Sequence, residues 1–180
     1  MISEVLNQAI QDFINSNLNK DISKIAFQKN PFPEVDFAVI LNQITAKSKS
    51  EHKLPTWFST EEIVYPSKIS VEQTSSEKTA LYKSELISGE SLIDLTGGFG
   101  VDDFYFSKKF KSVVHCEMDY ELSDIVNHNF QQLKAENIKC FAGDSFEILK
   151  NLNRKFDWIY IDPSRRSDAK GKVFLLKDCL

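Results

Sequence analysis

The sequence has little cysteine and no long hydrophobic run, and each shortage excludes a class of protein. Its three cysteines (Cys116, Cys140 and Cys179) are widely spaced and form no Cys-x-x-Cys pair. That spacing excludes a disulfide framework or a zinc knuckle and favours a reducing compartment. No apolar run approaches the roughly 18 residues that a membrane helix needs, and residues 1–17 lack the layout of a signal peptide. We therefore expect a soluble, cytoplasmic protein that has no metal site and no membrane contact.

An excess of positive charge is also absent. Lysine and arginine number 22 against 26 aspartates and glutamates, which gives a net charge of −4. The surface as a whole therefore carries no basic field for nucleic acid, although a local basic patch is compatible with this balance. Hydrophobic residues make up 42% of the 180 residues and charged residues 27%. This composition excludes a disordered or fibrous chain and predicts one ordinary domain, or a core domain with a small cap.

The pattern of residues 1–65 predicts helices. Apolar residues recur at helical spacing over 5–14 and again over 37–44, as they do on the buried face of an amphipathic helix. The Lys-rich stretch 47–53 that follows is interpreted as a solvated loop or helix end, with a nucleic-acid contact as the alternative. We predict a small all-α cap domain over residues 1–65 and place a domain boundary there.

From residue 66 to residue 180, short apolar runs alternate with helical patterns. The runs cover 92–95, 113–116, 138–141 and 157–161. Strands that alternate with helices imply parallel pairing through right-handed crossovers. We therefore predict an α/β fold with a doubly wound, mainly parallel sheet in this part of the chain.

A glycine-rich loop follows the first of these strands and opens a helix. Glycines let the backbone turn tightly and let a ligand approach without an intervening side chain, and open parallel sheets bind ligands at the carboxyl ends of their strands. The Gly-Gly-Phe-Gly spacing lacks the third glycine of the dinucleotide fingerprint, and the preceding carboxylate would repel a pyrophosphate but attract an ammonium group. A ligand-free turn is the alternative. The loop residues assigned to ligand binding are Asp94, Thr96, Gly97, Gly98 and Gly100.

Acidic residues end the next two strands. A carboxylate at Glu117, which is followed by Met118, can accept both hydroxyls of a ribose; an exposed acid in a turn, or a helix N-cap, is the alternative. Asp144 ends the third strand, where it could bind an adenine amino group or cap the helix that begins at Ser145. We expect all four residues to contact the same ligand.

The fourth strand ends at a short run of functional residues. The carboxylate of Asp162 and the carbonyl of Pro163 offer two acceptors that could hold a planar amino group, and we assign them the catalytic role. Arg165 and Arg166 could bind phosphate or carboxylate bidentately, and Ser164 is grouped with them as substrate-binding. A turn that carries two solvated arginines is the alternative.

A further candidate precedes the helix before the first strand. The hydroxyls of Thr74 and Ser75, beside Gln73, could receive a ligand carboxylate together with the N-terminus of that helix. A helix-capping box at Ser75 or Ser76 explains these residues equally well.

In this order along the chain, these features resemble the class I S-adenosylmethionine-dependent methyltransferases. The resemblance implies that the Asp94 loop is the first motif, Glu117 the ribose acid, Gly143-Asp144 the adenine-contacting motif and Asp162-Pro163 the fourth motif. It also implies S-adenosylmethionine as the cofactor and a Rossmann-like sheet of strand order 3-2-1-4. Ser164 and Arg165 depart from the Asp-Pro-Pro-Tyr pattern of the amino-methyltransferases.

Segments 30–33, 52–57, 72–83 and 162–166 resemble, more narrowly, a bacterial methyltransferase group with a THUMP-like domain after the catalytic domain. The resemblance implies seven strands, of which about four can be counted before Leu180. We therefore expect an N-terminal fragment whose residues 66–180 are the first half of the methyltransferase domain. Such a fragment should bind cofactor poorly and self-associate through the unpaired edge of its fourth strand, unless residues 172–180 fold over that edge.

We predict a methyltransferase that transfers a methyl group from a sulfonium to a nucleophile held by Asp162 and Pro163. RNA is the favoured substrate because of the THUMP-like association, the two arginines and the Lys-rich stretch 47–53. A small-molecule or protein acceptor, and a non-catalytic module that binds cofactor or RNA, are the alternatives. A nicotinamide-dependent oxidoreductase is least favoured, given the glycine spacing.

Overall fold

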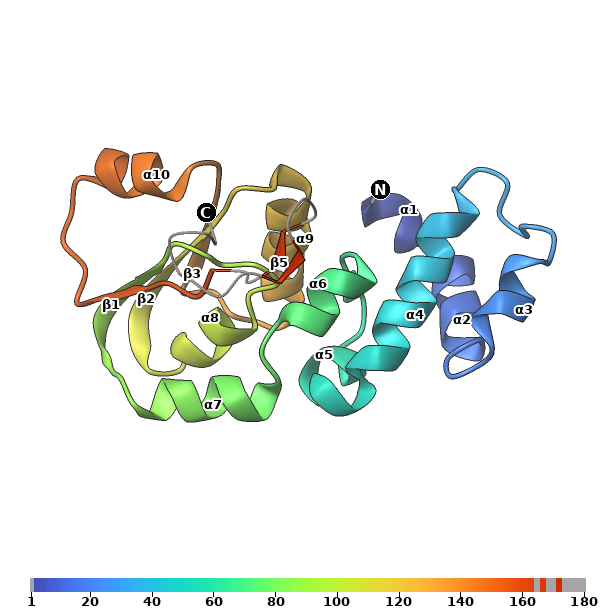
Figure 1. Ribbon diagram of the computed structural model, residues 1–180, viewed down its shortest axis with the longest axis horizontal. Coiled ribbons are helices and arrows are strands. Elements are labelled where there is room, and N and C mark those ends of the chain that lie inside the picture. The colour runs from blue at the N-terminus through green and yellow to red at the C-terminus, as the bar shows by residue number, and fades with distance from the viewer. Residues whose placement is uncertain (1, 164–165, 168–170, 173–180) are drawn as a thin grey trace.

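The computed structural model describes residues 2–163, 166–167 and 171–172. A group of helices formed by the first part of the chain lies beside a parallel sheet with its own helices (Figure 1). In the described residues, no helix is long and apolar enough to span a bilayer. The same residues contain no cluster of His, Cys, Asp and Glu side chains suited to hold a metal ion.

The N-terminal helices form because their apolar stripes are capped by polar residues and bury against one another. The helices are α1 (Ile2–Val5), α2 (Gln8–Ser16), α3 (Ile22–Ala26), α4 (Phe37–Lys53) and α5 (Pro55–Ser59). The side chains of Asn7, Asp21 and Asp36 accept backbone N–H groups at the starts of α2, α3 and α4, as N-caps do. A small core joins α2 to α4, and it consists of Val5, Ile10, Ile14, Val35, Ile40 and Ile44.

Residues 46–65 pack with the sheet rather than with this small core. The Trp57 ring is fully buried and makes an edge-to-face contact with Phe104, with 5.0 Å between ring centroids. Tyr65 belongs to the same cluster as Leu92 of the first strand. The boundary near residue 65 stays a prediction, and side chains on both sides of it share one core.

Side-chain amides hold the extended segment that leads into the sheet domain. The Gln43 amide accepts from the Tyr65 N–H at 2.9 Å and donates to the Tyr65 carbonyl at 2.5 Å. The Asn129 amide pairs in the same way with Val64, at 2.9 and 2.8 Å. These amides satisfy buried backbone groups that no neighbouring strand reaches, and so they tie the segment to α4 on one side and to α9 (Tyr120–Gln132) on the other.

The sheet has the predicted order. Strands β1 (Gly89–Asp94), β2 (Phe110–Glu117), β3 (Ile138–Ala142) and β4 (Trp158–Tyr160) pair in parallel in the order β3-β2-β1-β4. The prediction of a Rossmann-like, doubly wound fold is therefore confirmed, as is the helical N-terminal region. Past these strands, β5 (Arg166–Ser167) and β6 (Gly171–Lys172) form a short antiparallel pair.

Helices cover both faces of the sheet. The helices of this part are α6 (Lys68–Gln73), α7 (Glu77–Glu85), α8 (Val101–Phe106), α9 and α10 (Ser145–Leu152). Leu92 and Val113 face the cluster that includes α8 and α9 residues, whereas Ile93 and Val114 face the α10 side. Figure 1 shows α10 and the pair α7–α8 on opposite sides of the strands. Apolar residues on both faces of a strand are the reason that each strand appears as a continuous apolar run.

The edge of β4 is exposed in the described structure. Trp158 and Ile159 are 43% and 53% exposed, and Ile161 is 52% exposed. Residues 172–180 are the segment that is expected to fold over this edge if no partner does. Residues 173–180 lie outside the described residues, and only the backbone of Lys172 is described, so this expectation stays a prediction. An apolar strand edge that is not covered is a template for pairing with another chain.

We therefore expect the 180-residue chain to self-associate through β4. Sedimentation velocity over a hundredfold range of protein concentration should show a mass that rises with concentration. Ile159→Lys, which places a charge on the edge, should shift the chain towards monomer, whereas Phe27→Lys, at an exposed aromatic on the N-terminal helices, should not. A wild-type chain that stays monomeric at every concentration would contradict this prediction.

Candidate functional site

A cleft of about 1090 Å³ opens at the carboxyl ends of the four parallel strands. It is large enough for a nucleoside-sized ligand. The structure brings to it predicted site residues from five separate segments, and these are Gln73, Thr74, Ser75, Asp94, Thr96, Gly97, Gly98, Glu117, Met118, Asp144, Ser145, Asp162 and Pro163. Ser164 and Arg165 lie outside the described residues, as does the side chain of Arg166.

The glycine loop is held between β2 and the start of α8. The Gly97 N–H donates to the Cys116 carbonyl at 2.9 Å, and the Gly100 N–H donates back to the Gly97 carbonyl at 3.0 Å. A Cβ on Gly97 would lie 2.2 Å from Cε1 of His115. The loop therefore rests directly on the imidazole ring, and only glycine fits there.

Gly100 is buried where the loop meets α9. It does not line the cleft in the described structure. Its φ of 75° begins α8, and a Cβ there would lie 2.5 Å from Cζ of Phe130. This glycine therefore serves the close packing of the loop against α9, and its contact with a ligand stays a prediction.

Glu117 lies at the end of β2 with its carboxylate fixed by two backbone groups. Oε2 accepts from the Gly98 N–H and Oε1 from the Asp119 N–H, each at 2.9 Å. The N-cap role considered for Glu117 belongs to Asp119, whose Oδ1 accepts from the first turn of α9. A carboxylate oxygen has two lone pairs, so Glu117 is oriented and can still accept hydroxyl groups.

Asp144 caps a helix, as one of its two interpretations expected. Its Oδ1 accepts from the N–H groups of Phe146 and Glu147 at 2.9 and 3.0 Å. The Phe146 ring is 61% exposed and the Met118 side chain 69% exposed, and both line the cleft. Exposed apolar side chains in a polar cleft suit the faces of a flat ring; the sequence analysis did not identify Phe146.

Asp94 is more deeply buried than its predicted role implies. Only 2% of it is exposed, and its Oδ1 accepts from the N–H and hydroxyl of Thr96 at 2.7 and 3.0 Å. Burial, and then the nearby Asp103, raise the pKa of Asp94 well above its ordinary value. Burial thus disfavours the charged form of this carboxyl, and the contact between Asp94 and a ligand stays a prediction.

Thr96 links the first motif to the fourth. Its Oγ1 accepts the Asp162 N–H at 2.7 Å, while its own hydroxyl donates to Asp94. The Leu95 N–H donates to the Tyr160 carbonyl at 3.0 Å. The backbone at the end of β4 is therefore fixed to the glycine loop, and the Asp162 side chain, 55% exposed, faces the cleft.

A buried pair that the sequence analysis missed lies under the loop. Nδ1 of His115 and Oδ2 of Asp103 are 2.6 Å apart, and both side chains are fully buried. Burial raises the pKa of Asp103 and lowers that of His115, which favours a neutral hydrogen-bonded pair. A histidine within an apolar strand was the signal that could have identified the pair.

Lysines 47, 49 and 53 lie in the last turns of α4, and each has an intramolecular partner. Lys49 forms an ion pair with Glu72, and Lys53 donates to the Val71 and Glu72 carbonyls at 2.9 and 2.7 Å. Lys47 donates to Asn15 at 2.8 Å. The stretch is thus a helix end that fixes α6, as one of its interpretations held, and these contacts favour that role over a nucleic-acid patch.

Known proteins that share sequence with this chain include one from Porphyromonas gingivalis and one from Mycoplasma mobile. A crystal structure of a "putative methyltransferase" from Porphyromonas gingivalis W83 is 30% identical, with a TM-score of 0.75 over 91% of this chain and 41% of that one. An "Uncharacterized RNA methyltransferase" of Mycoplasma mobile is 31% identical over 94 residues, which are 52% of this chain and 26% of the relative. The chain thus spans less than half the length of either protein.

These likenesses agree with the resemblance to class I methyltransferases at the level of the fold. The solved structure shares nearly the whole described chain, including the helices before the sheet. Residues 43–176 also match a protein family, and this range begins within α4. The chain belongs to the family described as Conserved hypothetical protein 95.

Proposed function

We propose that the protein to which this chain belongs is an S-adenosylmethionine-dependent methyltransferase of the cytoplasm that acts on RNA. The observation that carries the proposal is the single cleft at the strand ends, where the predicted motifs meet. A THUMP-like domain after the catalytic domain is part of the same proposal. A small-molecule or protein acceptor is the second candidate within the enzyme class.

The cleft residues fit S-adenosylmethionine. Glu117 offers an oriented carboxylate for a ribose, Met118 and Phe146 offer apolar surfaces for a flat base, and Gly98 lies open, because a Cβ on it would meet nothing nearer than 3.8 Å. When bound, this cofactor supplies an electrophilic methyl group on a sulfonium.

The chain's own residues would position the nucleophile. Asp162 and Pro163 line the cleft, where the Asp162 carboxylate and the Pro163 carbonyl would accept hydrogen bonds from a donor group on the substrate. Holding two reactants in line accounts for most of the acceleration in such a transfer. In the described residues no basic side chain lines the cleft, whereas six acids do: Glu72, Asp94, Asp102, Glu117, Asp144 and Asp162.

Cofactor binding tests the proposal directly. Glu117→Ala should weaken S-adenosylmethionine binding by about ten- to hundredfold, because a charge-assisted pair of hydroxyl contacts contributes roughly 1.5–3 kcal/mol. Glu121→Ala, an exposed acid in the first turn of α9, is the control. Calorimetry on both variants, with NAD alongside, measures the difference. Equal losses of affinity in the two variants would show that Glu117 does not bind the ribose. A protein that binds NAD but not S-adenosylmethionine would contradict the methyltransferase proposal.

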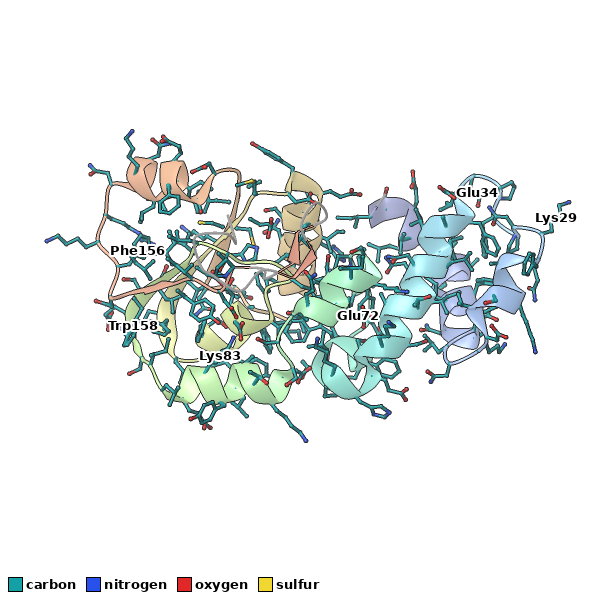
Figure 2. The ribbon with its side chains drawn as sticks, in the orientation of Figure 1. Lys29, Glu34, Glu72, Lys83, Phe156 and Trp158 are labelled. Atoms are coloured by element: carbon teal, nitrogen blue, oxygen red, sulfur yellow. The ribbon has the colours of Figure 1, made fainter. Side chains whose placement is uncertain are left out.

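RNA recognition should depend on positive charge that the acidic cleft residues do not supply, because phosphates are repelled by carboxylates. The double variant Arg165→Ala, Arg166→Ala of the full-length protein should bind RNA more weakly and with a shallower salt dependence, since each phosphate contact contributes to that slope. Lys24→Ala with Lys29→Ala removes the same charge from the N-terminal helices and is the control; Lys29 is labelled in Figure 2. If RNA affinity falls equally steeply with salt concentration in the wild type and in the arginine variant, the two arginines do not contact phosphates and their role is structural.

A further inference from the structure

Lys83, on α7, contacts four residues that line the cleft. Its Nζ lies 2.6 Å from the Tyr160 hydroxyl, 3.0 Å from Oδ2 of Asp102, 3.0 Å from Oγ of Ser75 and 3.2 Å from Oδ2 of Asp162. Figure 2 shows Lys83 between α7 and the strands. The four partners all line the cleft, so this ammonium lies within hydrogen-bond distance of four cleft residues.

The partners come from segments that are far apart in the sequence. Ser75 precedes α7, Asp102 lies in the first turn of α8, and Tyr160 and Asp162 end the fourth strand. The Ser75 hydroxyl also donates to Asp102 at 3.0 Å. One side chain thus connects three separate segments that line the cleft.

The ammonium is held in its charged form. Burial alone would lower the pKa of Lys83, but hydrogen bonds to Tyr160 and Asp102 outweigh burial and raise the pKa above its ordinary value. The Lys83 side chain is 25% exposed and that of Asp102 is 14% exposed. A cation that is mostly removed from water, with fixed partners, is an oriented charge rather than a mobile surface lysine.

The orientation of the Asp162 carboxylate depends on the charge of Lys83. Its side chain is half exposed, and its contacts in the described structure are Lys83 and, at 3.3 Å, the Tyr160 hydroxyl. Without the ammonium, the carboxylates of Asp102 and Asp162 would repel each other across the space that Lys83 fills. Asp162 would then be free to turn towards solvent.

We propose that Lys83 is a positioning residue of the methyl-transfer site, holding the Asp162 carboxylate in the direction in which it meets the acceptor. The proposal rests on the proposed function. Lys83 acts through Asp162 and Tyr160 and does not itself touch the reacting atoms. Its removal should therefore lower the rate of transfer and leave cofactor binding nearly unchanged.

The test compares three variants of the full-length protein. Lys83→Met keeps the length of the side chain and removes its charge, Lys83→Arg keeps the charge, and Lys78→Met alters an exposed lysine on the same helix. Calorimetry with S-adenosylhomocysteine measures cofactor-site affinity. Single-turnover transfer of radioactive methyl from S-adenosylmethionine to total RNA, taken from cells that lack the protein, measures the reaction.

Lys83→Met should lower the transfer rate by about ten- to hundredfold, as misplaced reacting groups do, and change the S-adenosylhomocysteine Kd by less than about threefold. Lys83→Arg should recover most of the rate, and Lys78→Met should match wild type. An unchanged rate in Lys83→Met would overturn the proposal, as would equal losses of rate and affinity or a failure of arginine to recover the rate. A wild-type protein that does not bind S-adenosylhomocysteine would instead overturn the proposed function, and the role of Lys83 with it.

Discussion

Replacing Asp162 with alanine in the full-length protein should abolish methyl transfer while S-adenosylmethionine affinity stays within a few fold. The backbone of Asp162 is held by the Thr96 hydroxyl at 2.7 Å, and a substitution at Cβ leaves that bond intact. The carboxylate is half exposed at the cleft, where it can accept a hydrogen bond from the nucleophile. Loss of this acceptor should cost at least about a hundredfold in rate, because orientation of the reactants is the main source of acceleration.

Filter-binding transfer assays and calorimetry on the same protein preparations measure the two quantities separately. Glu85→Ala, which removes an exposed acid at the end of α7, controls for the loss of one negative charge and should leave both unchanged. Transfer by Asp162→Ala at a rate close to that of wild type would show that the acceptor is held elsewhere. A large loss of cofactor affinity would assign Asp162 to the cofactor instead.

The fold was predictable because each of its strands carries a strong local signal. Leu92 and Ile93 face opposite layers, as do Val113 and Val114, and burial on both faces produces the apolar runs that single out parallel strands. The predicted cleft residues follow from the same fact, since parallel strands bring their carboxyl ends to one edge. The positions of Asp94, Glu117, Asp144 and Asp162 in one cleft therefore needed no knowledge of side-chain packing.

The residues that the sequence analysis missed depend on contacts between distant segments. Lys83 looks like an ordinary surface lysine on an amphipathic helix, and only the return of β4 brings Tyr160 and Asp162 to it. Asp103 and His115 are separated by a turn and a strand, and their pairing arises where α8 crosses β2. Local pattern does not show which side chains pair, although a histidine within an apolar strand indicates that it has a buried partner.

Gly100 and the Lys-rich stretch were identified from the sequence, but their roles also depend on contacts with distant segments. A glycine in a ligand-binding loop can serve the ligand or the packing beneath the loop, and the position of Phe130 shows that Gly100 serves the packing. The lysines at 47–53 are interpreted from the sequence as a solvated loop or helix end, with a nucleic-acid contact as the alternative, and the partners that favour the helix end are Glu72 and two carbonyls supplied by α6. Both interpretations needed the neighbouring element, which the sequence does not place.

Replacing Gly97 with alanine should disrupt the cofactor site more than any other single methyl group added to the loop. The new Cβ would lie 2.2, 2.3 and 2.7 Å from three atoms of the His115 ring, closer than non-bonded atoms approach. The ring cannot turn away, because it is fully buried, bonded to Asp103 at 2.6 Å, and packed edge-to-face on Phe130. The loop must therefore lift from β2.

Lifting the loop would break the Gly97 N–H bond to Cys116 and move the Gly98 N–H away from Glu117. We expect S-adenosylmethionine affinity to fall by at least about a hundredfold and the free energy of unfolding to fall by about 1–3 kcal/mol, as overpacked sites do. Calorimetry and urea denaturation measure the two effects. If Gly97→Ala binds the cofactor as wild type does, the close packing of loop on ring is not required for the site.

A second substitution at the clashing ring tests the steric cause. His115→Ala removes the atoms that the new methyl group meets, so Gly97→Ala combined with His115→Ala should bind S-adenosylmethionine more tightly than Gly97→Ala alone. His115→Ala by itself should weaken binding, since it removes the support under the loop and leaves Asp103 without its partner. Residues in contact give such non-additive effects, whereas distant sites add. Simple additivity of the two losses would mean that the loop and the ring act independently, and the role of the buried pair as the support for the glycine loop would be wrong.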